Sequence, residues 1–370
     1  MSRRSMRANF SAIGVLVLLG NSLAAPTGQT AAGEVSQDRM KAIYEEVKTP
    51  FKYGIVIEPP TGKKVDCPTV FRHRGKWYMV YVQLEPAPLE GYTTQLAESE
   101  NLLQWKPLGT ILPRGEESAW DRANAAGGVA LFDAAWGGSH GLQTHGGRYW
   151  MSYLGGRGYG YEAVPLSIGL ASTADPSAPQ HWSKAGAPIL TTTDRDVRPG
   201  ETGTLYKSYI FIDDAKSLGA RFVMFYNAKP LDGSEKIFSG VSDDLRHWRR
   251  AGTEPAIENL APDPARAVIS GDPQVVRMGD VWVMFYFGAF WKPGAFDTFA
   301  ASKDLITWTK WTGDDLIRPT EPYDTPFAHK PWLIKHDGVV YHFYCAVGGQ
   351  KAEHRAIALA TSKDMGRGRR

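Results

Sequence analysis

The chain has 370 residues, of which 43% are hydrophobic and 12% aromatic, and this is enough apolar material for a large globular core. Its formal charge at pH 7 is only +3, so no strong positive field for nucleic acid or anionic lipid is expected. The two cysteines, Cys67 and Cys345, are too few for a disulfide scaffold and lack zinc-site spacing.

Residues 1–24 have the pattern of an export signal. Arg3, Arg4 and Arg7 precede an apolar run, and a small-residue cleavage site ends at Ala24. The pattern fits a Sec signal or a twin-arginine signal, and both predict a periplasmic or extracellular protein. The apolar run is too short to span a bilayer, so no membrane anchor is expected. Cleavage would remove three arginines and leave a formal charge of zero, which favours neutral partners.

The segment 25–58 is predicted to hold a small polar leader and one helix. The helix is expected from Ser36 to Val47, with Ser36 as its cap and an apolar face that includes Met40 and Ile43. Such a helix leaves open a homodimer in which it reaches a second copy of the chain. The remaining residues, 59–366, are assigned to a single β domain.

Five short apolar runs that end in tyrosine recur through this domain. They occupy residues 77–81, 149–153, 222–226, 282–286 and 340–344. Their final tyrosines are 72, 73, 60 and 58 residues apart, and a tryptophan follows each of the first four. Repeated β patterns of this kind predict a repeat architecture. Four strands for each copy give an all-β, five-bladed β-propeller, whereas a β-sandwich would not require five copies.

Cys67 and Cys345 lie in the first and last repeats, which become neighbours when such a ring closes. A disulfide between them is conceivable in an exported protein, but its geometry is demanding, so two buried free thiols are favoured.

One position of each repeat should open onto the shared axis. It lies where the first strand of the repeat starts, 14 or 15 residues before the tyrosine in most copies. The positions found are Asp66, the neighbourhood of Ser139 and His140, Glu201, Asp272 and His329. An aspartate before proline often only forms a turn. Three carboxylates and a histidine at one repeat position nevertheless predict a functional site, because crowded like charges are costly unless a task or a cation retains them.

Such a set suits glycoside hydrolysis. That reaction needs one group to protonate the leaving oxygen and a second to activate water or attack the sugar. A histidine can serve as the proton donor because it titrates near neutrality. No cofactor is required by this chemistry, although a divalent cation in the central channel is compatible with it.

The chain resembles the superfamily of five-bladed β-propeller glycosidases, which includes glycoside hydrolase families 32, 43, 62, 117 and 130. The resemblance rests on the five repeats, on Asp66-Cys67-Pro68 and Gly271-Asp272-Pro273, and on the S-x-D-L-x-x-W tails of the repeats. It covers nearly the whole mature chain. The long W-M-N-D-P-N-G motif of the fructan-cleaving family is absent, which disfavours a fructosidase.

Two members of the superfamily imply different roles for the axial residues. Similarity to family 43 implies Asp66 as general base, Asp272 at the position of the general acid and Glu201 as modulator of the acid. In family 43 the acid is a glutamate and the modulator an aspartate, so these two residue types are exchanged here. Similarity to family 117 implies Asp66 as base and His329 as acid, with Asp272 beside them. An N-terminal helix before the propeller also favours family 117.

Further residues near the predicted mouth could bind substrate by stacking on a sugar or bonding its hydroxyls, although each tryptophan is more often packing. They are Trp120, Arg122, Trp136, His140, Trp291, Lys330 and Trp332. The glycine-rich segment 155–160 loosely resembles a dinucleotide loop, but no β-α-β context follows it.

The sequence therefore predicts an exported, exo-acting and inverting glycosidase. It would release a terminal sugar resembling anhydrogalactose, arabinofuranose or xylose from an oligosaccharide or polysaccharide. A family-130-like phosphorylase, with Lys330 and Arg198 on phosphate, and a non-catalytic glycan-binding propeller are the alternatives.

Overall fold

The computed structural model describes residues 33–263, 265–349 and 352–367. The expected signal at residues 1–24 lies outside these residues. Helix α1 (Gln37–Val47) begins after Ser36, whose hydroxyl accepts a hydrogen bond from the Arg39 amide, as the sequence predicted. Its apolar side packs on the protein's own strands, with Met40, Ile43 and Val47 almost fully buried. The apolar side that could have served a homodimer is thus covered within the chain.

The remainder is β structure, as expected, arranged in antiparallel four-stranded units. Unit 1 comprises β2 (Lys64–His73), β3 (Lys76–Glu85), β4 (Gly91–Ser99) and β5 (Lys106–Leu112). Unit 2 comprises β6 (Asn124–Val129), β7 (Tyr149–Gly156), β8 (Ser167–Thr173) and β9 (Ser183–Lys184). Unit 3 comprises β10 (Thr204–Ile212), β11 (Phe222–Lys229), β12 (Lys236–Ser242) and β13 (Arg249–Arg250).

The last two units share one eight-stranded sheet, because β16 and β18 are joined by a single parallel pair, Ala295 with Phe327. Unit 4 comprises β14 (Ile269–Met278), β15 (Val281–Ala289), β16 (Ala295–Ser302) and β17 (Thr309–Lys310). Unit 5 comprises β18 (Phe327–His336), β19 (Val339–Gly348), β20 (His354–Thr361) and β1 (Phe51–Ile57). The short 3-10 helices η1 (Pro199–Glu201) and η2 (Pro322–Asp324) precede β10 and β18.

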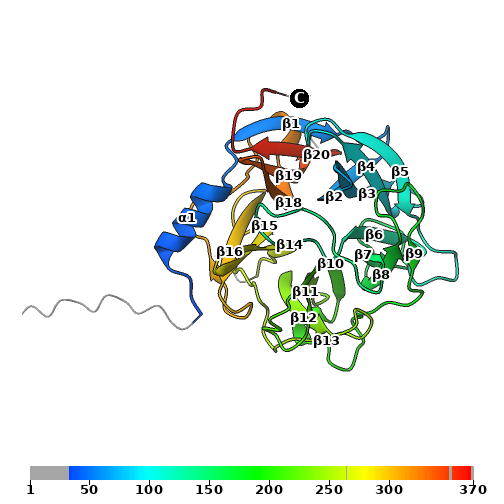
Figure 1. Cartoon of the computed structure of the whole chain (residues 1–370). Helices are drawn as coiled ribbons and strands as arrows, with labels where there is room; N and C mark the ends of the chain where they lie inside the picture. Colours follow the sequence, from blue (N-terminus) through cyan, green and yellow to red (C-terminus); the bar gives the residue numbers. More distant parts are fainter. Residues whose placement is uncertain (1–32, 264, 350–351, 368–370) are drawn as a thin grey trace, which may run out of the picture.

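The units stand around a common centre, with the first strand of each nearest to it (Figure 1). Along the chain, β2 contacts β6, β6 contacts β10, β10 contacts β14 and β14 contacts β18, and β18 in turn contacts β2. Strand β1 pairs with β20, so the N-terminal segment forms the outer strand of the last unit. The β domain therefore starts at Phe51, earlier than the residue 59 that the repeats predicted.

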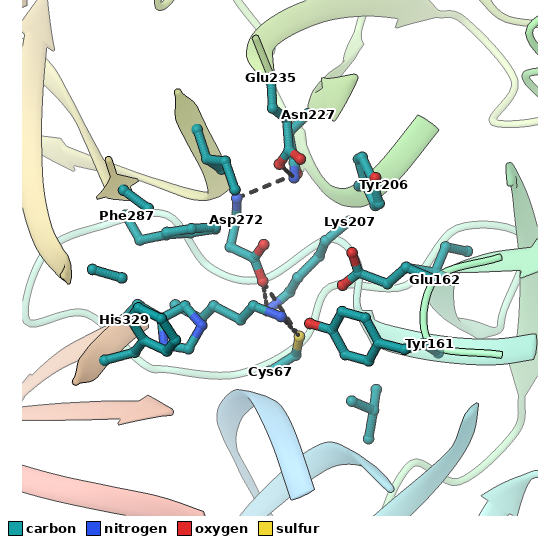
Figure 2. Close-up of a pocket in the computed structure, with 18 of the residues that line it drawn as sticks. Cys67, Tyr161, Glu162, Tyr206, Lys207, Asn227, Glu235, Asp272, Phe287 and His329 are labelled. Atoms are coloured by element: carbon teal, nitrogen blue, oxygen red, sulfur yellow. Dashed lines mark hydrogen bonds and ion pairs between the residues drawn. The ribbon is translucent and has the colours of Figure 1, made fainter. Parts of the chain in front are cut away.

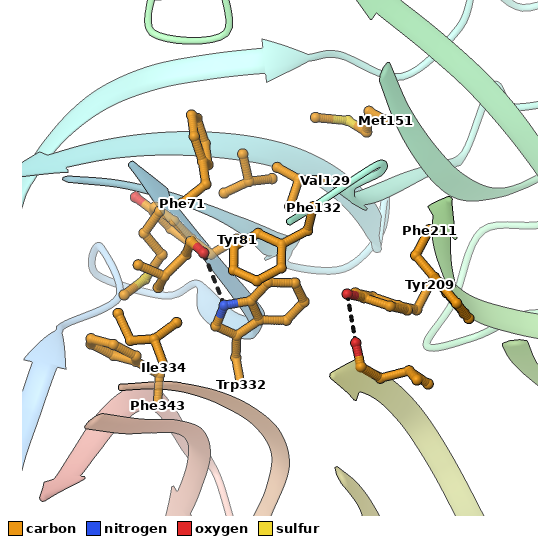
Figure 3. Packing of buried hydrophobic residues seen from close by; sticks show 14 of the residues in the cluster. Phe71, Tyr81, Val129, Phe132, Met151, Tyr209, Phe211, Trp332, Ile334 and Phe343 are labelled. Atoms are coloured by element: carbon orange, nitrogen blue, oxygen red, sulfur yellow. Dashed lines mark hydrogen bonds between the residues drawn. The ribbon is translucent and has the colours of Figure 1, made fainter. Parts of the chain in front are cut away.

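Aromatic side chains fill the space between the first strands below the site. Trp332 is 1% exposed, and its indole nitrogen donates to the Val70 carbonyl at 2.9 Å (Figure 3). Phe132 and Tyr209 pack against it with ring centroids 5.2 and 5.8 Å away. Trp332 is thus part of the core that separates the two ends of the molecule, and it does not reach the cavity described below.

Candidate active site

A cavity of about 290 Å³ opens at the end of the molecule where the first strands begin (Figure 2). Three acidic side chains line it: Glu162, Glu235 and Asp272. Three basic side chains line it as well: Lys207, Lys330 and Arg355. The rest of the wall includes aromatic and aliphatic groups such as Phe287, Phe327 and Leu154. An apolar pocket with a few converging polar groups is the usual form of a small-molecule site.

β-bulges aim three of the wall residues into the cavity. Cys67, Asp272 and Lys330 each precede a proline, have φ of 50°, 52° and 65°, and lie where the pairing register of β2, β14 and β18 shifts. A bulge places an extra residue in one strand and redirects its side chain. The residue before each proline is therefore the equivalent position in units 1, 4 and 5.

This equivalence corrects the alignment used on the sequence. Asp66 and His329 occupy the preceding position, where unit 4 has Gly271. Asp66 and Asp272 are consequently not equivalent, and they lie at different depths. Asp272 and His329 line the cavity, whereas Asp66 lies directly behind Cys67, Lys330 and Arg355, which do.

Asp66 is buried between two cations. Its Oδ2 accepts hydrogen bonds from Lys330 Nζ and Arg355 Nη1, each at 2.8 Å, and its Oδ1 accepts one from the Cys67 amide at 2.9 Å. Burial alone would raise the pKa of this carboxyl, but the two cations hold the pKa of Asp66 well below its usual range. A carboxylate bound in this way is a counter-ion for Lys330 and Arg355 and a poor base.

Asp272 has weaker partners and faces the cavity more openly. Its Oδ2 lies 3.6 Å from Lys207 Nζ and accepts from the Cys67 thiol at 3.4 Å. Its backbone amide donates to Asn227 Oδ1 at 3.2 Å. The burial of Cys67 and the nearby Asp66 raise the pKa of the thiol, so Cys67 carries its proton beside Asp272. Cys67 and Cys345 are free and buried, as the sequence favoured.

His329 is placed as expected but has the wrong titration for a proton donor. Its Nδ1 lies 3.2 Å from the Cys345 carbonyl, and its ring packs edge-on against Phe287 with centroids 5.2 Å apart. Burial, together with the neighbouring Lys330, lowers the pKa of His329 to about 3. The imidazole is therefore neutral at physiological pH.

Glu235 is the cavity group that holds a proton near neutrality. It precedes β12, is 6% exposed, and accepts a hydrogen bond from the Asn227 side-chain amide. Burial, and then repulsion by Glu162, raise the pKa of Glu235 to about 8. A neutral carboxylic acid at pH 7 in a substrate-sized pocket is the state that a general acid needs.

Glu162 is the second carboxylate that the repeat pattern did not reveal. It lies between β7 and β8 with φ of 51°, and Figure 2 shows it pointing into the cavity together with Lys207 and Asp272. Glu162 and Glu235 occupy the same connection, between the second and third strands, in units 2 and 3. The glycine-rich segment 155–160 directly before Glu162 was the available signal.

Glu201 does not reach the cavity. It ends η1, and its carboxylate accepts from Arg198 Nη2 at 2.9 Å and from Arg250 Nε at 2.7 Å, with the Tyr226 hydroxyl as a third donor. Burial alone would raise its pKa, but Arg198 and its other partners hold the pKa of Glu201 below its usual range. The position expected for Glu201 is taken by Tyr206 and Lys207, which lie at the register shift of β10.

His140 and Trp136 lie at the opposite end of unit 1. The His140 carbonyl accepts from the Arg72 amide at the end of β2, and Trp136 donates to Glu46 of α1. The reason is a long connection, residues 130–148, between β6 and β7. The first strand of unit 2 therefore precedes His140, where the sequence had placed its start.

The remaining sequence candidates make packing and ion-pair contacts, except Lys330, which lines the cavity as predicted. Trp120 stacks on Tyr153, and Trp291 packs on Phe296. Arg122 pairs with Glu117 and donates to the Arg157 carbonyl. In the described part of the chain, no group of three or more His, Cys, Asp or Glu side chains is arranged to hold a metal ion. Within the same residues, no helix has the length and apolar character needed to cross a membrane.

Solved structures similar to this chain are glycosidases. One is a glycoside hydrolase and another is a complex of BT0996 with RGII; each is 49% identical, with the match covering 90% of this chain and 97% of the other at a TM-score of 0.86. A thermostable family-43 glycoside hydrolase shares the fold, with 18% identity, coverage of 82% and 91%, and a TM-score of 0.58. No protein-family model and no curated protein matches the chain. The chain belongs to the superfamily of propeller-type glycoside hydrolases and is a glycosidase.

Proposed function

We propose that the protein is an exo-acting glycosidase in which Glu235 is the general acid and Glu162 is the second catalytic carboxylate. The observation that carries this assignment is the protonated state of Glu235, since its pKa of about 8 keeps it neutral at pH 7. Glu162 faces the same cavity and is the charged group that contributes most to this shift. Two carboxyl groups with separated roles are what glycoside hydrolysis requires.

The proposed reaction follows the ordinary course of this chemistry. Glu235 donates its proton to the glycosidic oxygen as the bond from that oxygen to the anomeric carbon breaks. In the inverting course predicted from the sequence, Glu162 removes a proton from a water molecule, and the water oxygen bonds to the anomeric carbon. In a retaining course, Glu162 itself would attack that carbon. NMR of the first-formed anomer distinguishes the two.

The substrate group in the cavity is proposed to be a neutral terminal sugar. Each basic side chain of the wall already has a carboxylate partner: Lys207 has Asp272, and Lys330 and Arg355 share Asp66. An anionic sugar, or a phosphate for phosphorolysis, would find no uncompensated cation among these groups. Anhydrogalactose, arabinofuranose and xylose are all neutral. The small volume of the cavity favours one terminal residue over an internal segment of a long glycan.

The fold and the location of the protein are proposals as well. The cyclic contacts of the five first strands, and the pairing of β1 with β20, support a five-bladed propeller closed between its N- and C-terminal strands. The pattern of residues 1–24 supports export.

A substrate screen tests the proposal. Sugar release is measured by chromatography from aryl glycosides and plant or algal oligosaccharides, and RGII is included because a similar structure is named as a complex with it. Glu235→Gln and Glu162→Gln should each lower kcat on an oligosaccharide by at least about a thousandfold. Glu254→Gln, at an exposed glutamate, is the matched control. Binding of oligosaccharides without release by the unaltered protein would contradict catalysis, and strong phosphate dependence would contradict hydrolysis.

A further inference from the structure

Arg355 connects the buried Asp66 to the segment that carries Glu162. It lies at the start of β20, and its Nη1 donates to Asp66 Oδ2 at 2.8 Å and to the Tyr161 hydroxyl at 3.1 Å. The guanidinium also lies over the Tyr161 ring, 5.1 Å from its centroid. Tyr161 is the residue before Glu162, so one arginine joins unit 5 to the connection between β7 and β8.

Asp66 gives this arginine a rigid anchor. The carboxylate is 2% exposed and is held independently by Lys330 Nζ and by the Cys67 amide. A planar guanidinium that bonds a fixed carboxylate has its direction set, and it can present its remaining edge to a second acceptor. Tyr161 is that acceptor, and the stacking of its ring fixes the side chain in a second direction.

Glu162 needs such support because its backbone is strained. A non-glycine residue with φ of 51° persists only where the surroundings hold it, and such residues cluster at functional sites. The other ties to this segment come from Glu90, whose carbonyl accepts from the Gly160 amide at 2.9 Å and whose carboxylate accepts from the Tyr161 amide at 3.1 Å. The backbone is thus held on one side of Tyr161 and its side chain on the other.

We propose that Arg355, anchored by Asp66, is a positioning residue that keeps Glu162 in its reactive place through Tyr161. This inference rests on the proposed role of Glu162. It explains why a carboxylate at the entry of unit 1 is retained although it lies behind the cavity wall. Asp66 then affects the reaction only through the position of Glu162.

Single substitutions test the connection. Tyr161→Phe keeps the ring over Arg355 but removes the hydroxyl, and Arg355→Lys keeps the charge beside Asp66 but cannot bond two partners at fixed angles. Each should lower kcat by about tenfold to a hundredfold, since small displacements of a reacting group cost that much. KM should change by less than about threefold, and the melting temperature should stay close to that of the unaltered protein.

Tyr159→Phe is the matched control. Tyr159 lies in the same connection and is similarly exposed, at 38% against 45% for Tyr161, and its ring lies between Arg114 and Arg122. Within the described residues its hydroxyl has no hydrogen-bond partner, so its removal should leave kcat unchanged.

A double-mutant cycle separates positioning from a general structural effect. Glu162→Asp shortens the side chain and misplaces the carboxylate by itself. If Tyr161 acts through Glu162, the loss in kcat from Tyr161→Phe should be much smaller in the Glu162→Asp background than in the unaltered protein. Equal losses in both backgrounds, or an unchanged kcat for Tyr161→Phe, would overturn the inference. A raised KM with unchanged kcat for Arg355→Lys would also overturn it, because Arg355 would then bind the sugar directly.

The proposed function can fail separately. Full activity of Glu162→Gln would remove Glu162 from the reaction. Loss of activity in Glu162→Gln, with no effect of Tyr161→Phe, would reject only the positioning role.

Discussion

Replacing Glu235 with glutamine should stabilise the protein while it abolishes the reaction. Its pKa is about 8 in the folded protein against an ordinary value of 4.5. At pH 7 the unfolded carboxyl would be ionised, whereas the folded one keeps its proton. The folded state therefore forgoes the free energy of ionisation over about 2.5 pH units, which corresponds to about 3 kcal/mol. Glutamine carries no such cost and can still accept the hydrogen bond from Asn227.

The pH dependence identifies this mechanism. The protonated carboxyl costs nothing below its unfolded pKa, so the two proteins should be equally stable at pH 4. The difference should grow as the pH rises above about 4.5 and level off above about 8. Urea unfolding at pH 4 and pH 7 measures it, with Glu254→Gln as the exposed control. A stability difference that is the same at both pH values would refute the assignment of the raised pKa to Glu235.

Three further results are expected. With an oligosaccharide substrate, kcat/KM should fall above about pH 8 as Glu235 ionises, and Lys229→Met should move this fall to higher pH because it removes a cation that lowers the pKa of Glu235; an unmoved profile would contradict this electrostatic account. His329→Asn should lower kcat by less than about tenfold, because a histidine with a pKa of about 3 has no proton to donate at pH 7, and a thousandfold loss would restore it as the acid. Glu201→Gln should destabilise the fold by about 3 kcal/mol in thermal or urea unfolding, since two buried arginines lose their shared carboxylate, while kcat per folded molecule is unchanged; a lower kcat would place Glu201 in the reaction.

The repeats identified the general architecture because periodicity is a property of local sequence. The final tyrosines mark the second strands, and counting back from them found the correct end of units 1, 4 and 5. Counting could not resolve a single extra residue in a bulge, so Asp66 and Asp272 were treated as equivalent. It also failed in units 2 and 3, where the connection 130–148 and the register shift at Tyr206 alter the spacing.

The two carboxylates assigned to catalysis here could not be found in this way. Glu162 and Glu235 lie in connections that differ in length and have no repeated motif. Their proximity depends on how units 2 and 3 stand around the centre, and the raised pKa of Glu235 depends on burial that sequence does not report. The sequence therefore predicted the place of the site and part of its wall, whereas the acid required the structure.

The three prolines at the cavity wall separate the shape of the backbone from the chemistry that it presents. Units 1, 4 and 5 use the same bulge to offer a thiol at Cys67, a carboxylate at Asp272 and an ammonium group at Lys330. Because the bulge is set by the strand and the following proline, the side chain before the proline can be exchanged without moving the sheet. Relatives built on this scaffold can accordingly diverge in sugar preference through changes at these three places, leaving the aromatic packing around Trp332 untouched.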